Sequence, residues 1–203
     1  IKAPIAVLRV LTQREDTKEN QEMRSELFRI EQYVDMALCY ARLGKDASDL
    51  VLQEYALDTI IRKAIRKYAG QFIRKKIRLV YSGTDERALT DEKWLGFVIG
   101  QLLSNALKYT KKGKISIYMR AEEPHTLVIQ DTGIGIRQED LPRVFEKGFT
   151  GYNGREEGRS TGIGLYLSGK IMKKLDHGIR IESELGKGTR VFLELGRKKM
   201  DLY

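Results

Sequence analysis

The first 43 residues carry a repeat of apolar side chains with the period of a packed helix. Steps of four and three residues alternate from residue 23 to residue 41, which is typical of a helix that packs along a seam in a bundle or coiled coil. Asp16 and Glu19 have the spacing of a capping box at its start, and Gly44 is placed to end it. The apolar positions of this repeat are Met23, Leu27, Ile30, Val34, Ala37 and Ala41.

A shorter helix is expected before this one. Ile5, Leu8 and Leu11 have helical spacing, and Pro4 suits the first turn of a helix or a kink in a longer one. A hairpin of two helices buries little apolar surface alone, and dimerisation into a four-helix bundle would cover the rest. We therefore predict a dimerising hairpin over residues 1–46, the alternative being a hairpin packed on the rest of the same chain.

The pattern changes after residue 49, where short runs of β type alternate with amphipathic helices. Paired strands with helices on one side describe an α+β fold, a two-layer α/β sandwich over residues 47–203. The expected strands are 51–55, 77–82, 114–121, 125–131, 179–184 and 189–195, and the expected helices are 57–72, 91–109 and one that starts near Thr161.

Composition narrows the class of protein. The longest apolar run, residues 95–103, is too short for a membrane span of about 20 residues. The single cysteine, Cys39, excludes an internal disulfide and fits a reducing compartment. The net charge of +9 is concentrated in residues 62–78, which hold eight basic residues and no acidic one. We interpret that stretch as the solvated face of a helix.

Polar residues interrupt the expected helix 91–109 near its end. Gln101 and Asn105 are four residues apart and share one face, and Lys108 lies beside them. An amide oxygen can ligate Mg²⁺, and a lysine can meet a phosphate as a point charge. The alternative is a surface pair of Asn and Lys.

The next candidate is DTGIGI, residues 131–136, directly after an apolar strand. A carboxylate at a strand end, here Asp131, can accept a hydrogen bond from an exocyclic amine such as that of adenine. Gly133 and Gly135 would let a flat ring approach the backbone. A simple turn would explain the same pattern.

A glycine-rich loop from residue 147 leads into the helix expected near Thr161. Gly162 and Gly164 would leave backbone N–H groups open to an anion, with Arg159 adding charge from a loop that closes like a lid. GKGT, residues 186–189, reads as a hairpin turn. Neither a Walker A loop nor a Rossmann fingerprint is present in the sequence.

The order of these segments resembles a known family. N-A-x-K-Y, D-x-G-x-G, the pair Phe145 and Phe149, G-x-G-L and G-x-G-T follow one another like the N, G1, F, G2 and G3 boxes of the Bergerat-fold ATPases. More narrowly, residues from about 50 to 195 resemble the ATP-binding domain of bacterial sensor histidine kinases. The segments GFTGYNGR and STGIGLYL are similar to segments of the intramembrane-sensing kinases of the bacitracin-resistance type.

The resemblance implies ATP and Mg²⁺ as cofactors. It makes Asn105 the Mg²⁺ ligand with Gln101 as a second candidate, and it makes Asp131 the acceptor for the adenine amine. Many relatives carry an arginine where this chain has Thr150, so a lid contact from that position is not expected. The nucleotide-binding residues it implies are Asn105, Lys108, Tyr109, Asp131, Gly133, Gly135, Ile136, Arg159, Thr161, Gly162, Gly164, Leu165 and Thr189.

The first four residues, IKAP, resemble the end of the phosphoacceptor motif H-E-x-K-x-P. The resemblance places the acceptor histidine two positions before Ile1 and its glutamate directly before it, so we expect no catalytic residue in this sequence. His125 and His177 do not match the acceptor context. The chain is therefore expected to bind ATP without phosphorylating itself.

The resemblance also implies a cellular setting. We expect the cytoplasmic portion of a bacterial inner-membrane protein, a homodimer that passes phosphoryl groups to a response-regulator receiver domain. A membrane transporter is a further candidate partner, and nucleic acid is not expected. Two alternatives stay open: an ATPase of the gyrase, Hsp90 or mismatch-repair type, and a basic module that binds nucleic acid through residues 62–78.

Overall fold

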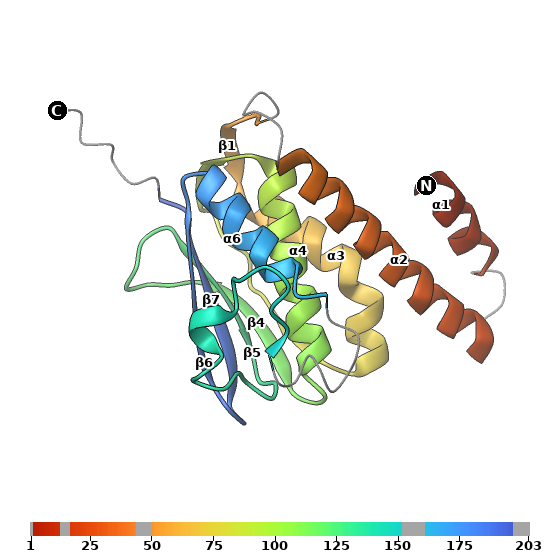
Figure 1. Cartoon of the computed structure of the whole chain (residues 1–203). Helices are drawn as coiled ribbons and strands as arrows, with labels where there is room; N and C mark the ends of the chain where they lie inside the picture. Colours follow the sequence, from red (N-terminus) through yellow and green to blue (C-terminus); the bar gives the residue numbers. More distant parts are fainter. Residues whose placement is uncertain (1, 13–16, 44–49, 152–160, 197–203) are drawn as a thin grey trace. The chain divides into compact units, whose positions relative to one another are not determined.

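The chain divides into two compact units, Ile1–Ser48 and Asp49–Tyr203. The computed structural model describes residues 2–12, 17–43, 50–151 and 161–196. Figure 1 shows the elements of both units in chain order. Each unit has its own packing, and the second contains the segments that carry candidate chemistry.

The first unit is a hairpin of two helices, α1 (Lys2–Leu11) and α2 (Lys18–Leu43). The hydroxyl oxygen of Thr17 accepts a hydrogen bond from the Asn20 amide at 3.2 Å, so Thr17 caps the start of α2. An ion pair of 3.2 Å between Arg9 and Glu31 joins the two helices. The predicted capping residue Asp16 and the predicted end at Gly44 lie outside the described residues.

The apolar repeat of α2 stays largely uncovered in the single chain. Leu27 is buried, but Met23 and Ile30 are 48% and 46% exposed. Val7 and Val10 of α1 are exposed as well. Packing of α1 on α2 therefore leaves an apolar stripe along the hairpin.

The second unit is a sheet with helices on one face, which confirms the predicted two-layer sandwich (Figure 1). The five-stranded sheet has the order β2-β4-β5-β7-β6, in which only the β2–β4 pair is parallel. Its strands are β2 (Arg78–Val80), β4 (Lys114–Met119), β5 (Thr126–Asp131), β6 (Gly178–Glu184) and β7 (Gly188–Glu194). A separate antiparallel pair joins β1 (Gln53–Ala56) to β3 (Arg87–Thr90).

Three helices cover the inner face of this sheet. They are α3 (Leu57–Lys75), α4 (Glu92–Tyr109) and α6 (Gly164–Lys174), with a short 3₁₀ turn η2 (Leu141–Arg143) before α6. Alternate residues of the strands point toward the helices, so the core forms between the layers. Its fully buried members include Ile60, Ile61, Leu95, Ile99, Leu103, Leu107, Ile115, Leu127, Leu167 and Leu193.

Asp91 fixes the start of α4. One carboxylate oxygen accepts from the amides of Lys93 and Trp94 at 2.8 and 3.1 Å, and the other accepts from the Val51 amide at 2.9 Å. The carboxylate therefore caps the helix and ties it to the segment before β1.

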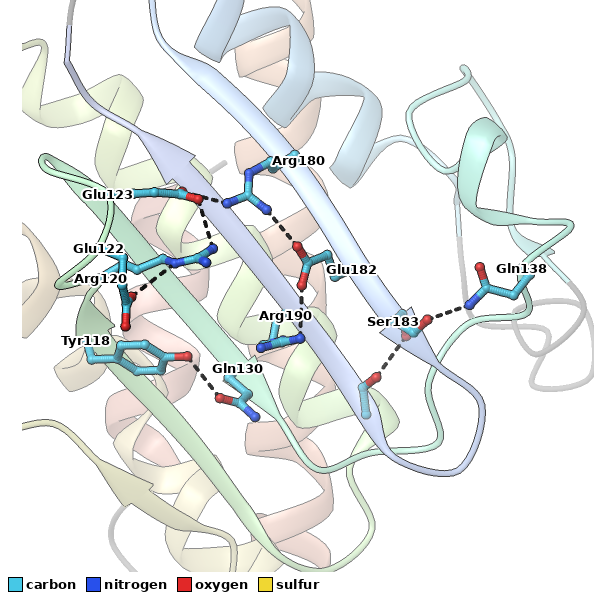
Figure 2. A network of polar contacts seen from close by, with 11 residues as sticks. Tyr118, Arg120, Glu122, Glu123, Gln130, Gln138, Arg180, Glu182, Ser183 and Arg190 are labelled. Carbon is cyan, nitrogen blue, oxygen red and sulfur yellow. Dashed lines mark hydrogen bonds and ion pairs between the residues drawn. The ribbon is translucent and has the colours of Figure 1, made fainter.

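The outer face of the sheet is closed by charged side chains. Phe192 of β7 lies on this face, yet it is only 2% exposed, because the guanidinium groups of Arg180 and Arg120 stack over its ring at 3.7 and 5.3 Å from the centroid. Arg180 in turn pairs with Glu123 at 2.6 Å and with Glu182 at 2.8 Å (Figure 2). A network of ion pairs thus covers the apolar centre of this face.

The structure differs from the sequence prediction at three points. Residues 87–90 form β3, a strand too short to show a period, which pairs with β1. The predicted strand 77–82 is reduced to β2. The helix expected near Thr161 begins at Gly164, because Gly162 has a φ of 65° and cannot belong to a right-handed helix.

Candidate functional site

Backbone hydrogen bonds join the segments with candidate chemistry. The segment after β5 lies against the end of α4, since the Ile134 amide donates to the Tyr109 carbonyl at 3.2 Å. It also lies against the β6–β7 turn, where the Gly186 amide donates to the Ile134 carbonyl at 2.8 Å. Segments that are far apart in the sequence are therefore built into one region.

Asp131 ends β5 with its carboxyl group buried. One carboxylate oxygen accepts from the Gly133 amide at 2.7 Å, and the backbone amide of Thr189 also donates to the group. Burial raises the pKa of Asp131 to about 6, although the two amides act in the opposite direction. The site therefore holds a carboxylate that is ionised near pH 7 at a cost in solvation.

The glycines after Asp131 are needed for contact between backbones. A Cβ atom on Gly133 would lie 2.6 Å from the Tyr109 carbonyl oxygen. Gly135 has a φ of 71°, and a Cβ there would lie 2.1 Å from the Glu184 carbonyl oxygen. The predicted approach of a flat ring to these glycines stays a prediction, because the close contacts here are within the chain itself.

Ser183 is a site residue that the sequence prediction missed. Its hydroxyl accepts from the Ile136 amide at 2.8 Å and donates to the Gly188 carbonyl at 2.9 Å. Its carbonyl accepts from the Gln138 side-chain amide at 2.9 Å (Figure 2). A signal was present in the sequence. Alternate residues of β6 face the helices, and Ser183 places a hydroxyl at the inward position after Ile181, where an apolar residue is expected.

The β6–β7 turn reaches the carboxylate from the other side. Gly188 has a φ of 110°, and a Cβ there would lie 2.1 Å from the Asp131 carbonyl oxygen. The next residue, Thr189, places its hydroxyl 2.9 Å from that of Ser183. The pattern of this turn alone indicated a hairpin, and the family resemblance implied a nucleotide contact for Thr189. The structure places the turn beside Asp131.

The end of α4 carries the predicted polar face. Asn105, Lys108 and Tyr109 are half-buried, and the Lys108 ammonium lies 5.1 Å from the centre of the Tyr109 ring. Among the described residues, no group of three or more His, Cys, Asp or Glu side chains could hold a metal ion.

Gln101 lies one turn earlier on α4 and is buried against α6. A Cβ on Gly164 would lie 2.7 Å from its side-chain oxygen, and the residue is 8% exposed. Gln101 therefore packs between α4 and the start of α6, and its predicted second role as a metal ligand stays a prediction.

The start of α6 is held by its glycines. The Gly148 amide donates to the Gly162 carbonyl at 3.0 Å, and no side chain caps the helix at Ile163. The first-turn amides of such a helix have no partner inside it, and the helix dipole favours an anion there. Thr161 is exposed and Leu165 is half-buried, whereas Arg159 lies outside the described residues.

The two phenylalanines between these segments are part of the packing. The Phe145 ring lies 3.3 Å from the position of a Cβ on Gly169, a residue of α6. The guanidinium group of Arg143 stacks over the Phe149 ring at 4.6 Å from its centre. Phe145 therefore packs the segment after η2 against α6, and Phe149 packs against Arg143 of η2.

Sequence comparison finds relatives of known type. The profile of the family described as histidine kinase-, DNA gyrase B- and HSP90-like ATPase matches residues 90–199. The sensor histidine kinase YxdK of Bacillus subtilis is 33% identical over 94% of this chain and 60% of its own length. The sensor protein BceS of the same organism is 34% identical over 93% of this chain and 57% of its own. The chain thus spans little more than half of these relatives.

Solved structures show the same fold. Full-length ShkA in complex with AMPPNP aligns with a TM-score of 0.65 at 20% identity, over 93% of this chain and 41% of its own. The catalytic domain of the histidine kinase ThkA aligns with a TM-score of 0.61 at 22% identity, over 71% of this chain and 97% of its own.

The two glycines at the start of α6 should respond differently to a methyl group. In Gly162→Ala the Cβ would lie 2.3 Å from the Gly148 backbone carbon and φ is positive, so we expect a loss of stability on the order of 2–4 kcal/mol. In Gly164→Ala only the end of the Gln101 side chain must move, so we expect a change within about 1 kcal/mol.

Urea unfolding of both variants measures this difference. The double variant Gln101→Ala/Gly164→Ala is the control, because it removes the atom that the new methyl group meets. Equal losses in the two single variants would contradict the assigned contacts.

The buried carboxyl group should make stability depend on pH. The pKa of Asp131 is about 6 in the folded chain and about 4 when unfolded. The folded state therefore binds the proton more tightly, so the contribution of Asp131 to stability falls as pH rises from about 4 to about 6. Asp131→Asn removes this term, and its stability relative to wild type should rise by on the order of 2 kcal/mol across that range.

Unfolding in urea at pH 4.5 and pH 7.5 measures the change, with Asp85→Asn in the exposed β2–β3 connection as the matched control. A constant difference between Asp131→Asn and wild type at both pH values would overturn the assignment.

Proposed function

Because the chain belongs to the histidine kinase-, DNA gyrase B- and HSP90-like ATPase family, on its bacterial sensor histidine kinase side, we propose that its second unit binds Mg²⁺-ATP for phosphoryl transfer to a histidine. The alternatives of a gyrase-type ATPase and a nucleic-acid module are not favoured, since the curated relatives above are sensor kinases.

The observation that carries the proposal is the buried carboxylate of Asp131. It is ionised near pH 7 in spite of its burial, and its donors among the described residues are two backbone amides. A carboxylate held in this way can accept a further hydrogen bond, and the exocyclic amine of adenine is a donor of the right kind. These contacts fit a purine base at the end of β5, with its exocyclic amine donating to the carboxylate of Asp131.

The phosphates would lie toward α4 and α6. The first-turn amides of α6 after Gly162 and Gly164 are oriented for an anion, and Lys108 can add a positive charge. Asn105 offers an amide oxygen, which suits Mg²⁺ because this ion takes one or two protein ligands and completes its shell with phosphate and water. The bound nucleotide supplies the phosphoryl group, and these residues position it and balance its charge.

Neither described histidine suits the role of phosphoacceptor. His125 accepts a backbone bond from Leu195 with its carbonyl, and its ring lies 2.9 Å from Glu86. His177 is 7% exposed, with its ring 3.2 Å from the Thr90 hydroxyl. We therefore do not propose either of these two histidines as the phosphoacceptor.

The first unit would provide the dimer interface. The apolar stripe of α2 is exposed in the single chain, and a second hairpin would cover it in a four-helix bundle. The phosphoryl group would then pass from the acceptor histidine to an aspartate of a response-regulator receiver domain.

The setting follows from the same family relationship. In the part of the chain that the structure describes, no helix has the length and apolar character to cross a membrane. We propose that the chain is the cytoplasmic portion of an inner-membrane sensor, with a membrane transporter as a candidate partner of the whole protein.

Calorimetry with ATP and Mg²⁺ tests the nucleotide site. Wild type should bind, and Asp131→Asn should bind at least about 10-fold more weakly, because an amide offers one acceptor oxygen in place of two. Affinity should also fall below about pH 6, where the carboxyl group becomes protonated. Asp85→Asn is the control and should bind like wild type.

The same protein incubated with γ-labelled ATP should stay unlabelled. Unchanged affinity in Asp131→Asn would remove the carboxylate from the site. Acid-labile label on His125 or His177 would contradict the location of the phosphoacceptor.

The dimer is tested by light scattering across a range of concentrations. Ile30→Glu places a charge in the exposed stripe of α2 and should shift the chain toward monomer, because an unpaired carboxylate in an apolar seam is costly. Ile73→Glu is the matched control, since Ile73 is exposed on α3 in the second unit. Monomeric wild type at every concentration, with Ile30→Glu unchanged, would rule out this interface.

A further inference from the structure

Five cations gather where α3 ends and the α4–β4 turn passes. The Arg78 amide donates to the Gly113 carbonyl at 3.0 Å, and Arg78 lies opposite Lys114 in the β2–β4 register. The turn before Lys114 and the residues before Arg78 are thereby brought together. We call this surface the basic edge, and its members are Lys76, Arg78, Lys111, Lys112 and Lys114, all exposed.

The basic edge has no acidic neighbours along either segment. Residues 59–84 and 93–121 contain no Asp or Glu, although the chain has 28. No member of the edge forms an ion pair with any residue that the structure describes, whereas the arginines of the outer sheet face are paired with glutamates. The positive charge of this surface is therefore left uncompensated.

The positive net charge of the chain comes from the unit that contains the basic edge. Residues 1–48 hold eight basic and eight acidic side chains, so the excess of nine positive charges belongs to the second unit. A concentrated positive surface attracts anionic partners over about one Debye length, near 8 Å at physiological salt.

Apolar side chains stand among these cations. Ile73 is 77% exposed, and its carbonyl accepts from the Lys76 amide at 3.1 Å, so it lies one turn from the edge. Val80 of the edge strand β2 is 41% exposed. Exposed aliphatic side chains beside lysines are typical of surfaces that lie in the headgroup layer of a membrane.

We propose that the basic edge binds an anionic phospholipid surface, with Ile73 entering the headgroup layer. Four of its five cations are lysines, which act as point charges and suit the diffuse charge of a lipid surface. A nucleic acid would use the cations but would gain nothing from Ile73 and Val80. The proposal goes beyond nucleotide binding and does not depend on it.

Protection of the edge strand explains only part of the cluster. Charged residues on an exposed strand such as β2 prevent it from pairing with another sheet, which accounts for Arg78 and its neighbour Lys114. Lys111 and Lys112 lie in the turn after α4, outside the strands, so strand protection gives no reason for them.

Sedimentation of the chain with vesicles tests the proposal. Vesicles with 30% phosphatidylglycerol in phosphatidylcholine should carry wild type down at 100 mM salt, and pure phosphatidylcholine vesicles should not. The variant Lys111→Gln/Lys112→Gln/Lys114→Gln should lose on the order of 100-fold in partitioning, at about 5-fold for each lysine. Ile73→Asn should also bind more weakly.

The matched control is Lys93→Gln/Lys170→Gln/Lys173→Gln, which removes the same charge from α4 and α6 away from the edge. It should sediment like wild type, and all variants should keep their affinity for ATP in calorimetry. If ATP binding fails while vesicle binding holds, the nucleotide proposal is wrong and this one stands.

Three results would overturn the proposal. Absence of binding to anionic vesicles at 100 mM salt is the first. An equal loss in the control variant is the second, because it would mean that net charge alone attracts the chain. The third is tighter binding to a short DNA duplex or to polyglutamate than to vesicles, which would assign the edge to a nucleic acid or an acidic protein.

Discussion

The buried carboxylate of Asp131 constrains much of the second unit. A carboxylate in a buried position is tolerated only when donors reach it, and here they are backbone amides from Gly133 and Thr189. These amides come from two different segments, so both must be held in place. The Tyr109 carbonyl holds the first through Ile134, and Ser183 holds the second through Gly188 and Thr189. The end of α4, the segment after β5 and the β6–β7 hairpin are therefore constrained by the same group.

Close backbone contacts explain why glycines recur in the segments around the site. At Gly133, Gly135, Gly162 and Gly188 a Cβ would come within 2.6 Å of a backbone atom of another segment. The site is thus built from backbone contacts, and the side chains of Asn105 and Lys108 lie half-buried at the end of α4. Its rigidity would come from the sheet and α4, whereas the recognition of base and phosphate would come from few side chains. Burial in this arrangement raises the pKa of Asp131 to about 6.

Sequence reasoning could find those parts of the site that depend on local pattern. Asp131 follows a continuous apolar run, which predicts the strand before it. Gln101, Asn105 and Lys108 share one face of an otherwise apolar helix, which predicts both the helix and its polar face. It could not find β3, because four residues show no period and they pair with another four-residue strand, β1. It could not assign Gln101, whose role depends on how closely α6 approaches α4. Ser183 could have been found, since a hydroxyl at an inward strand position is a break in the pattern.

The basic edge shows the same limit for charge. Residues 62–78 read as the solvated face of one helix because the sequence does not reveal that the α4–β4 turn lies beside the end of α3. The parallel register of β2 and β4 supplies that fact. On the outer sheet face the same domain pairs Arg120, Arg180 and Arg190 with glutamates over Phe192. Like charges repel one another and disfavour a compact state. The chain has 28 acidic residues, yet none of those that the structure describes pairs with a cation of the basic edge. The fold therefore separates a sheet face whose charges are neutralised from an edge whose charges are not. The uncompensated charge of the edge is suited to a partner that carries negative charge.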